Sequence, residues 1–321
     1  MRKMLLCAMV MGVLLAVVPP GAAEVSKPPI QLDVFAGFDY DSNVNLRSSE
    51  YDVRTFQPKG DAALYKHQAQ VGYNFAFNPK FSLLAQYTYY QDFHFRLTEY
   101  DNMSHNVTLS PTLNVLRNTG QIIAMCNFNY LTIGGNDYKV GWTFMPTYYQ
   151  MLARKVMLEV GGFYEYGTYY APIVNDDDDR TGNTVGLAAG LFFFFNDART
   201  GYLQLRYSPI WTLTEGSNFY GVGHKFQLAA MIPATKQLNI RPYISYGYYP
   251  YFNNWVNASA PNLNIYSKRE DSIVEGGVQV TYKFAQGFYV EGQYNFTAAN
   301  SNIAFYQYNR HVVGGKVGYR F

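Results

Sequence analysis

The last residues of the chain alternate between apolar and polar with a strict two-residue period. Val313, Val317 and Phe321 share one face of the segment 311–321, while Lys316 and Arg320 share the other. Successive side chains of a β-strand point to opposite faces, so this period predicts a strand whose two faces meet different surroundings.

The same alternation recurs along the whole chain. It predicts about fourteen strands of roughly ten residues each, the length needed to cross a bilayer at a tilt. The predicted strands are 32–40, 68–77, 81–90, 106–115, 121–130, 138–148, 156–166, 184–195, 202–210, 224–232, 238–248, 274–284, 288–297 and 312–321. An even number of similar strands in an unbroken series predicts an all-β fold, a single antiparallel up-and-down transmembrane barrel.

The segments between these strands alternate between short and long. The short ones are 78–80, 117–120, 152–155, 196–199, 233–236 and 285–287. Long polar segments, such as 41–64, 169–183 and 249–271, separate other pairs of strands. Membrane barrels have short periplasmic turns and long extracellular loops, so we expect both termini in the periplasm and one barrel domain over residues 24–321.

One face of the predicted strands is apolar and uncharged. Val71, Phe75 and Leu83 are typical of it, and no Asp, Glu, Lys or Arg falls on this face within any predicted span. A Lys or Arg facing lipid at the midplane costs roughly 2–4 kcal/mol, so the pattern indicates a lipid-facing surface. The opposite face is polar and rich in glycine. Aromatic residues gather near both strand ends as two girdles, which a soluble β-sandwich does not need.

The N-terminus predicts a secretory signal peptide over residues 1–23. Arg2 and Lys3 precede an apolar run over 4–18, and the small residue Ala23 suits the cleavage site. The predicted leader contains two of the 25 basic residues and none of the 23 acidic ones, so the rest of the chain is formally neutral. Nothing in this balance points to a nucleic-acid partner.

Composition adds to the argument for a membrane barrel. Charged residues are 15% of the chain and aromatic residues 18%, whereas soluble proteins have about 25% charged residues. The longest apolar stretch after the leader, 187–195, is too short to span as a helix. A membrane protein without spanning helices must be a closed barrel, because lipid cannot satisfy the hydrogen-bonding groups of an open sheet edge.

Cys126 is the one cysteine after the leader, so no intrachain disulfide is expected.

No catalytic arrangement is evident, and we predict no enzyme, no cofactor and no metal site. The chain lacks a Gly-x-Ser-x-Gly motif, and its histidines are scattered over different strands and loops: His67, His94, His105, His224 and His311. His94 and His105 flank one outer loop, and we interpret them as loop or interfacial residues. The run 176–179 contains four aspartates but lacks the spaced ligands of a calcium loop, so we interpret it as a solvated charge run.

The inward face predicts the wall of a lumen. Its candidate pore-lining residues are Lys66, Lys139, Glu159, Glu165, Arg206, Lys225, Arg241, Glu275, Lys283 and Glu291. The two signs are nearly balanced and spread around the wall, whereas a selective filter would cluster one sign at one height. Two interpretations stay open: a water-filled pore of weak selectivity, or groups that pair across the wall and stabilise a narrow barrel.

Closing the barrel brings the first strand beside the last. Opposite charges then share the inward face along this seam, and we hypothesise that they latch it: Asp33, Asp39, Asp41, Arg310, Lys316 and Arg320.

Two resemblances follow from the chain ends. The closing strand, with Val317, Tyr319 and a terminal Phe321, resembles that of bacterial outer-membrane barrels, which implies an assembly signal read by the barrel-assembly machinery. The motif Tyr-Asp-Ser-Asn-Val-Asn over 40–45, with Ser-Asn and Phe-Tyr-x-Tyr-x-Arg within 301–310, is similar to the barrel of surface lipoprotein assembly modifiers. That family's barrel also has fourteen strands. Its members carry a periplasmic helical repeat domain, while here only residues 24–30 precede the first predicted strand.

Three functions are therefore weighed for an integral protein of a Gram-negative outer membrane. The first is a weakly selective, porin-like conduit for small hydrophilic solutes. The second is a translocation or assembly barrel that works with a separate periplasmic partner. The third is a structural or adhesive barrel acting through its outer loops. In each case the expected surroundings are outer-membrane lipid and lipopolysaccharide.

Overall fold

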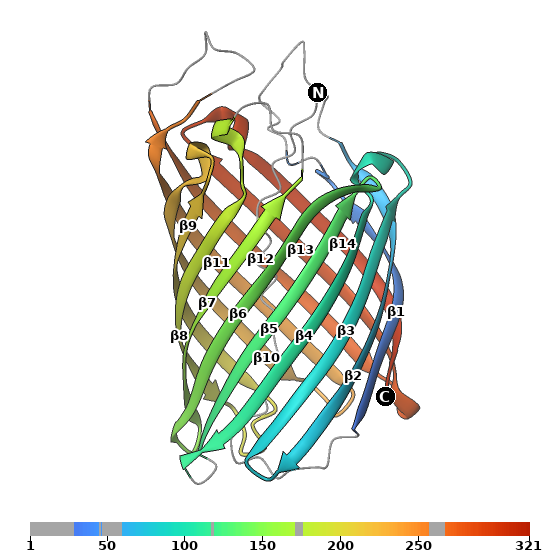
Figure 1. The fold of residues 1–321 in the computed structure, drawn as a ribbon. Helices are drawn as coiled ribbons and strands as arrows, with labels where there is room; N and C mark the ends of the chain where they lie inside the picture. Colours follow the sequence, from blue (N-terminus) through green and yellow to red (C-terminus); the bar gives the residue numbers. More distant parts are fainter. Residues whose placement is uncertain (1–28, 45, 47–59, 117–118, 171–175, 257–266) are drawn as a thin grey trace.

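The computed structural model describes residues 29–44, 46, 60–116, 119–170, 176–256 and 267–321. Within them, fourteen strands close into one antiparallel up-and-down barrel, the fold of outer-membrane β-barrels, in which β1 pairs with β14 (Figure 1). The strands are β1 (Ile30–Asp41), β2 (Ala62–Asn78), β3 (Phe81–His94), β4 (Asn102–Val115), β5 (Gly120–Ile133), β6 (Asn136–Ala153), β7 (Val156–Tyr169), β8 (Gly182–Phe194), β9 (Tyr202–Thr214), β10 (Gly221–Pro233), β11 (Leu238–Asn254), β12 (Lys268–Lys283), β13 (Phe288–Ser301) and β14 (Tyr308–Arg320). The predicted fold is confirmed, whereas the predicted signal peptide lies outside the described residues.

Several strands extend further than their alternation predicted. β2 begins at Ala62, and β11 runs to Asn254, where it still pairs with Lys268 of β12. Backbone pairing continues after the apolar pattern ends, because backbone groups at the outer end need partners whichever side chains they carry. The long outer segments predicted at 41–64 and 249–271 are correspondingly shorter.

The two ends of the barrel differ. The C-terminal strand ends at the edge with the short turns, drawn at the bottom of Figure 1. The opposite edge, called the outer end below, carries four short helices: η1 (Thr98–Tyr100), η3 (Asp176–Asp178), η4 (Ser217–Phe219) and η7 (Ala304–Tyr306). One connection there is short. Gly134 and Gly135 have φ values of 58° and 76° and form a two-residue turn between β5 and β6, a backbone shape that favours glycine.

The outer wall is apolar, as its pattern predicted. Large side chains such as Leu187, Phe226 and Val317 are exposed on it. Outward positions of the strands carry acidic or basic side chains only near the outer end, at Asp137, Lys268 and Glu270. A soluble protein rarely exposes so continuous an apolar surface, so this wall matches lipid.

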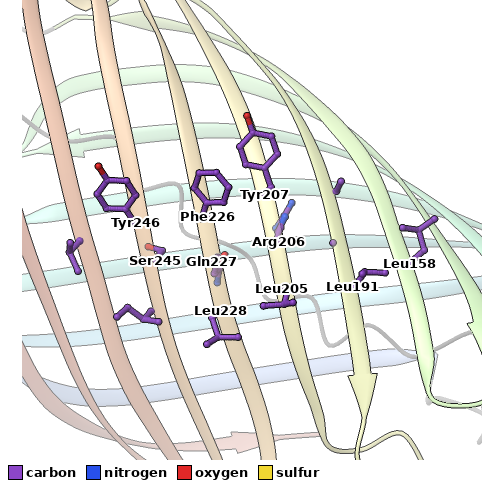
Figure 2. Close-up of a pocket in the computed structure, with 14 residues that line it drawn as sticks. Leu158, Leu191, Leu205, Arg206, Tyr207, Phe226, Gln227, Leu228, Ser245 and Tyr246 are labelled. Atoms are coloured by element: carbon purple, nitrogen blue, oxygen red, sulfur yellow. The ribbon is translucent and has the colours of Figure 1, made fainter.

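A hollow of about 740 Å³ lies across β7 to β12. Leu158, Leu191, Leu205, Phe226 and Leu228 line it from the outside of the barrel, as Figure 2 shows. Because these side chains belong to the outward face of their strands, the hollow is a depression of the lipid-facing wall and does not open on the lumen.

Within the described part of the chain, no helix is both long and apolar enough to cross a membrane.

Candidate functional site

The charged residues of the inner wall form ion pairs. Eight of the ten predicted pore-lining residues have a partner of opposite charge. The two partners occupy inward positions on strands one or two apart, so their side chains point to the same side of the sheet and can meet. The pairs are Lys66–Asp39 at 2.6 Å, Arg206–Glu159 at 3.5 Å, Lys225–Glu275 at 2.5 Å, Lys316–Glu291 at 2.8 Å, and Lys139–Glu165. This pairing agrees with the interpretation in which the inward charges pair across the wall and stabilise a narrow barrel.

The paired residues nevertheless leave space for water. The side chains of Glu275, Glu165 and Arg206 are 33%, 32% and 28% exposed, although they point into the barrel. Side chains in a packed core have almost no exposed surface, because interiors are as dense as organic crystals. The paired charges therefore leave unfilled space beside them inside the barrel, and the two interpretations are compatible.

Neutral polar side chains complete several of these pairs. Glu275 accepts a hydrogen bond from Ser245 at 3.0 Å, and Glu159 accepts one from Gln204 at 2.9 Å. Asp39 accepts one from Gln293 at 3.1 Å. A carboxylate with two or three donors is held in one position.

Arg241 and Lys283 differ from the other inward cations. No acidic side chain of the described residues lies within ion-pair distance of either. Arg241 donates only to the sulfur of Met231, at 3.4 Å. The charged groups that act on Lys283 are Arg320 and Arg241, which share its sign. Arg241, Lys283 and Arg320 lie toward the short-turn end of their strands, so positive charge gathers at this mouth of the barrel.

The inner wall also has an apolar region that the sequence did not predict. Tyr149, Met157, Phe192 and Phe194 form a buried cluster on β6 to β8, with Tyr202 of β9 packed against it. We had expected this face to be polar and rich in glycine, and for these strands that expectation was wrong. Phe192 and Phe194 stand among consecutive phenylalanines, so a two-residue period could not show which of them point inward.

At the outer mouth, aromatic rings surround a buried arginine. Arg269 bonds to Asp271 and lies 3.2 Å from the ring centroid of Tyr306, 4.4 Å from that of Tyr251 and 5.9 Å from that of Phe219. We call these five residues the outer arginine cluster. Burial raises the pKa of Tyr306, and its hydroxyl accepts a hydrogen bond from the indole of Trp255 at 3.0 Å. Arg269 and Asp271 lie on the inward face of β12, a signal from which these two of the five cluster residues could have been found.

Two of the four predicted solvated aspartates accept hydrogen bonds from a neighbouring loop, although none of η3 is buried. Asp177 accepts a hydrogen bond from Ser217 at 2.6 Å, and Asp178 accepts one from Asn218 at 2.9 Å. Asn218 is buried and also donates to the backbone of Val256. Asp177 and Asp178 thus join η3 to η4 while staying in contact with solvent. The sequence did not predict this junction, because hydrogen bonds between two loops leave no periodic signal in either segment.

His94 and His105 do not meet. His94 points inward and approaches Asp101 at 3.3 Å, whereas His105 lies on the outward face beside Tyr87. Asp92, which accepts hydrogen bonds from Asn102, joins His94 in bracing the loop that contains η1. Among the described residues, no group of three His, Cys, Asp or Glu side chains could hold a metal ion.

The six predicted seam residues form pairs that only partly cross the seam. Arg320 of β14 bonds to Asp33 of β1, and Arg310 of β14 bonds to Asp41 at 2.5 Å. The other two, Asp39 and Lys316, form their ion pairs within their own sides of the seam, with Lys66 and Glu291, although Asp39 also accepts a hydrogen bond across the seam from Gln293. Latching of the seam by the two crossing pairs stays a prediction.

The comparisons with known proteins concern architecture. No protein-family model matches this chain, and no curated protein matches its sequence. The structure is similar to OccAB3 from Acinetobacter baumannii, with 6% identity, a TM-score of 0.47, and 91% of this chain and 99% of that chain covered. It is also similar to OpdL from Pseudomonas aeruginosa, with 9% identity, a TM-score of 0.43, and 91% and 98% covered. The translocator domain of the autotransporter NalP from Neisseria meningitidis is 12% identical, with a TM-score of 0.38, and 93% and 90% covered.

The three residues of the predicted assembly signal lie at the end of β14. Val317 and Phe321 are exposed on the outer wall, and the ring of Tyr319 lies 5.0 Å from that of Phe288. The backbones of Phe321 and Leu32 exchange hydrogen bonds at 2.9 and 3.1 Å, so the last residue takes part in barrel closure.

Proposed function

We propose that this protein is an integral barrel of a Gram-negative outer membrane, with both termini in the periplasm, and conducts small hydrophilic solutes with weak selectivity. The observation that carries the proposal is the inner wall: Glu165 and Glu275 pair with Lys139 and Lys225 yet keep 32% and 33% of their side-chain surface exposed inside the barrel. A barrel that served only as a scaffold would have no need of such a wall, because an apolar packed interior is at least as stable as buried ion pairs.

The apolar outer wall supports the membrane location. An uncharged band between strand ends satisfies the requirement that lipid-facing side chains be apolar. The exposed end of β14, including Phe321, is available to the barrel-assembly machinery. Lipid and lipopolysaccharide are the expected surroundings of this wall.

The test is single-channel conductance of the folded protein in a planar bilayer. We expect stepwise openings with a reversal potential close to zero in symmetric salt and only a small shift in a salt gradient. Lack of conductance from protein that still migrates as a folded barrel on unheated gels would overturn the conduit. It would favour a translocation barrel with a periplasmic partner, or an adhesive barrel acting through its loops.

A further inference from the structure

Three identical side-chain pairs lie on the lipid-facing wall. In each, a tyrosine hydroxyl meets Nδ1 of a histidine on the next strand: Tyr87 with His105 at 2.7 Å, Tyr207 with His224 at 2.8 Å, and Tyr294 with His311 at 2.9 Å. The ring centroids are 6.1, 6.2 and 6.1 Å apart. We call these the three Tyr–His pairs.

The pairs share one position in the barrel. Each histidine is the fourth residue of its strand, counted from the outer end, on β4, β10 and β14. Each lies opposite the residue two places after its tyrosine: His105 opposite Tyr89, His224 opposite Pro209, and His311 opposite Phe296. The pairs are therefore at one height and are distributed around the barrel, which an accidental contact would not produce three times.

The remaining histidines provide the contrast. His67 also faces outward, but its Nδ1 is buried without a hydrogen-bond partner and its ring lies among Tyr65, Tyr89 and Phe93. His94 faces the lumen. Neither belongs to a Tyr–His pair.

Hydrogen-bond chemistry decides what each pair presents to the membrane. A neutral imidazole has one donor and one acceptor nitrogen, and a tyrosine hydroxyl can donate or accept. Nε2 of the three histidines has no partner among the described side chains. The ester groups of lipids only accept hydrogen bonds. When the tyrosine hydroxyl donates to Nδ1, the imidazole proton lies on Nε2 and points toward lipid, which is the tautomer that an ester acceptor requires.

Acidic residues on the outer wall indicate the depth in the membrane at which the Nε2–H groups lie. Tyr40 donates to Asp61 at 2.7 Å, Tyr130 donates to Asp137, and Glu270 bonds to Tyr248. These carboxylates stand at the outer rim and need water or headgroup surroundings. His224 lies opposite Tyr248, while Glu270 pairs with Pro250, two residues further out. Two strand residues correspond to roughly 5 Å along the tilted axis. The histidines thus lie one layer below the charged headgroups.

We propose that the three Tyr–His pairs bind the acyl-ester carbonyl oxygens of outer-leaflet lipids and thereby hold the barrel at a fixed depth. The Nε2–H group donates to the ester, while the tyrosine holds the imidazole in the required tautomer and orientation. The proposal rests on the membrane location proposed above and is independent of conduction.

The test is solid-state NMR on the full protein, purified in folded form from membranes and reconstituted in dimyristoylphosphatidylcholine. The histidines carry nitrogen-15 and the ester carbonyls of the lipid carry carbon-13. We expect the Nε2 signals of His105, His224 and His311 to be protonated and to lose intensity by dipolar contact with the ester carbon. His94 should show no such contact, because it faces the lumen.

The matched variant is the triple substitution Tyr87→Phe, Tyr207→Phe and Tyr294→Phe, which keeps the rings and removes the hydroxyls. We expect loss of the ester contact at the three paired histidines, with folding verified by gel mobility. Unprotonated Nε2 in the folded wild-type protein, or contact with lipid phosphorus in place of the ester carbon, would overturn the proposal. Failure of the membrane location itself is separately visible, because no histidine would then contact any lipid atom.

Discussion

Arg241 and Lys283 are the inward cations whose charge the described wall does not balance. Elsewhere in the lumen, each predicted pore-lining charge faces an opposite one, and these pairs largely cancel in the field felt by a passing ion. Near the mouth at the short-turn end, Arg241 and Arg320 act on Lys283 with the same sign, although Arg320 is also paired with Asp33. A weak preference for anions should therefore originate from two residues.

The first prediction concerns this preference. Arg241→Gln combined with Lys283→Gln should shift the reversal potential in a salt gradient toward cation preference, because the remaining lumen charges are paired. The measurement is single-channel recording under a tenfold gradient. Lys155→Gln, at an exposed turn outside the lumen, is the control and should leave the potential unchanged. An equal shift in both variants would mean that surface charge, and not the mouth, sets selectivity.

At the scale of elements, the seam between β1 and β14 depends on side chains as well as on backbone pairing. β14 carries Gly314, Gly315 and Gly318, which contribute no side-chain contact across the seam. Two arginine–aspartate pairs bridge the same strands near opposite ends of the barrel. Asp41 is almost completely buried, with its side chain 2% exposed, and Arg310 is the cation that pairs with it.

The second prediction follows from that burial. Arg310→Ala should lower the free energy of unfolding by roughly 3–5 kcal/mol, because it leaves a buried carboxylate without its partner. Urea unfolding of the barrel in vesicles, followed by tryptophan fluorescence, measures the change. Arg154→Ala removes the exposed pair with Asp197 at a turn and should cost no more than about 1 kcal/mol. Similar losses of unfolding free energy in both variants would show that the buried seam pair stabilises the barrel no more than an exposed surface pair does.

At the scale of the whole molecule, the barrel has three regions: an apolar outer wall, an inner wall of paired charges, and short helices at the outer end (Figure 1). The three tryptophans report on two of them. Trp142 and Trp211 lie exposed on the outer wall, whereas Trp255 is buried and donates to Tyr306 of the outer arginine cluster.

The third prediction uses these positions. Lipids with brominated acyl chains should quench most of the fluorescence of the wild-type protein, because bromine quenches indole rings that touch the chains. In the double variant Trp142→Phe, Trp211→Phe, the emission of Trp255 should persist in the same vesicles. Strong quenching of Trp255 would place the outer arginine cluster in lipid and would contradict its position at the mouth.

Alternation along the chain was sufficient to predict the barrel, its strand number and the outward face. These features follow from local geometry, since each strand must present every second residue to lipid. The same parity identified Lys225, Glu275 and the other pore-lining candidates as inward. It failed where both faces are apolar, as at Phe192 and Phe194, because the period disappears there.

Which inward charges pair, and which do not, was decided only by the tertiary structure. Lys225 and Glu275 are fifty residues apart and meet across β11, while Arg241 on that strand finds no acid. Barrel shear and strand stagger set these partners, and neither can be read from one strand alone. The loop contacts of Asp177 and Asp178, and the common height of the three Tyr–His pairs, likewise arise only when the sheet closes. Sequence by itself determined the two faces of every regular strand, and closure of the barrel determined the neighbours on each face.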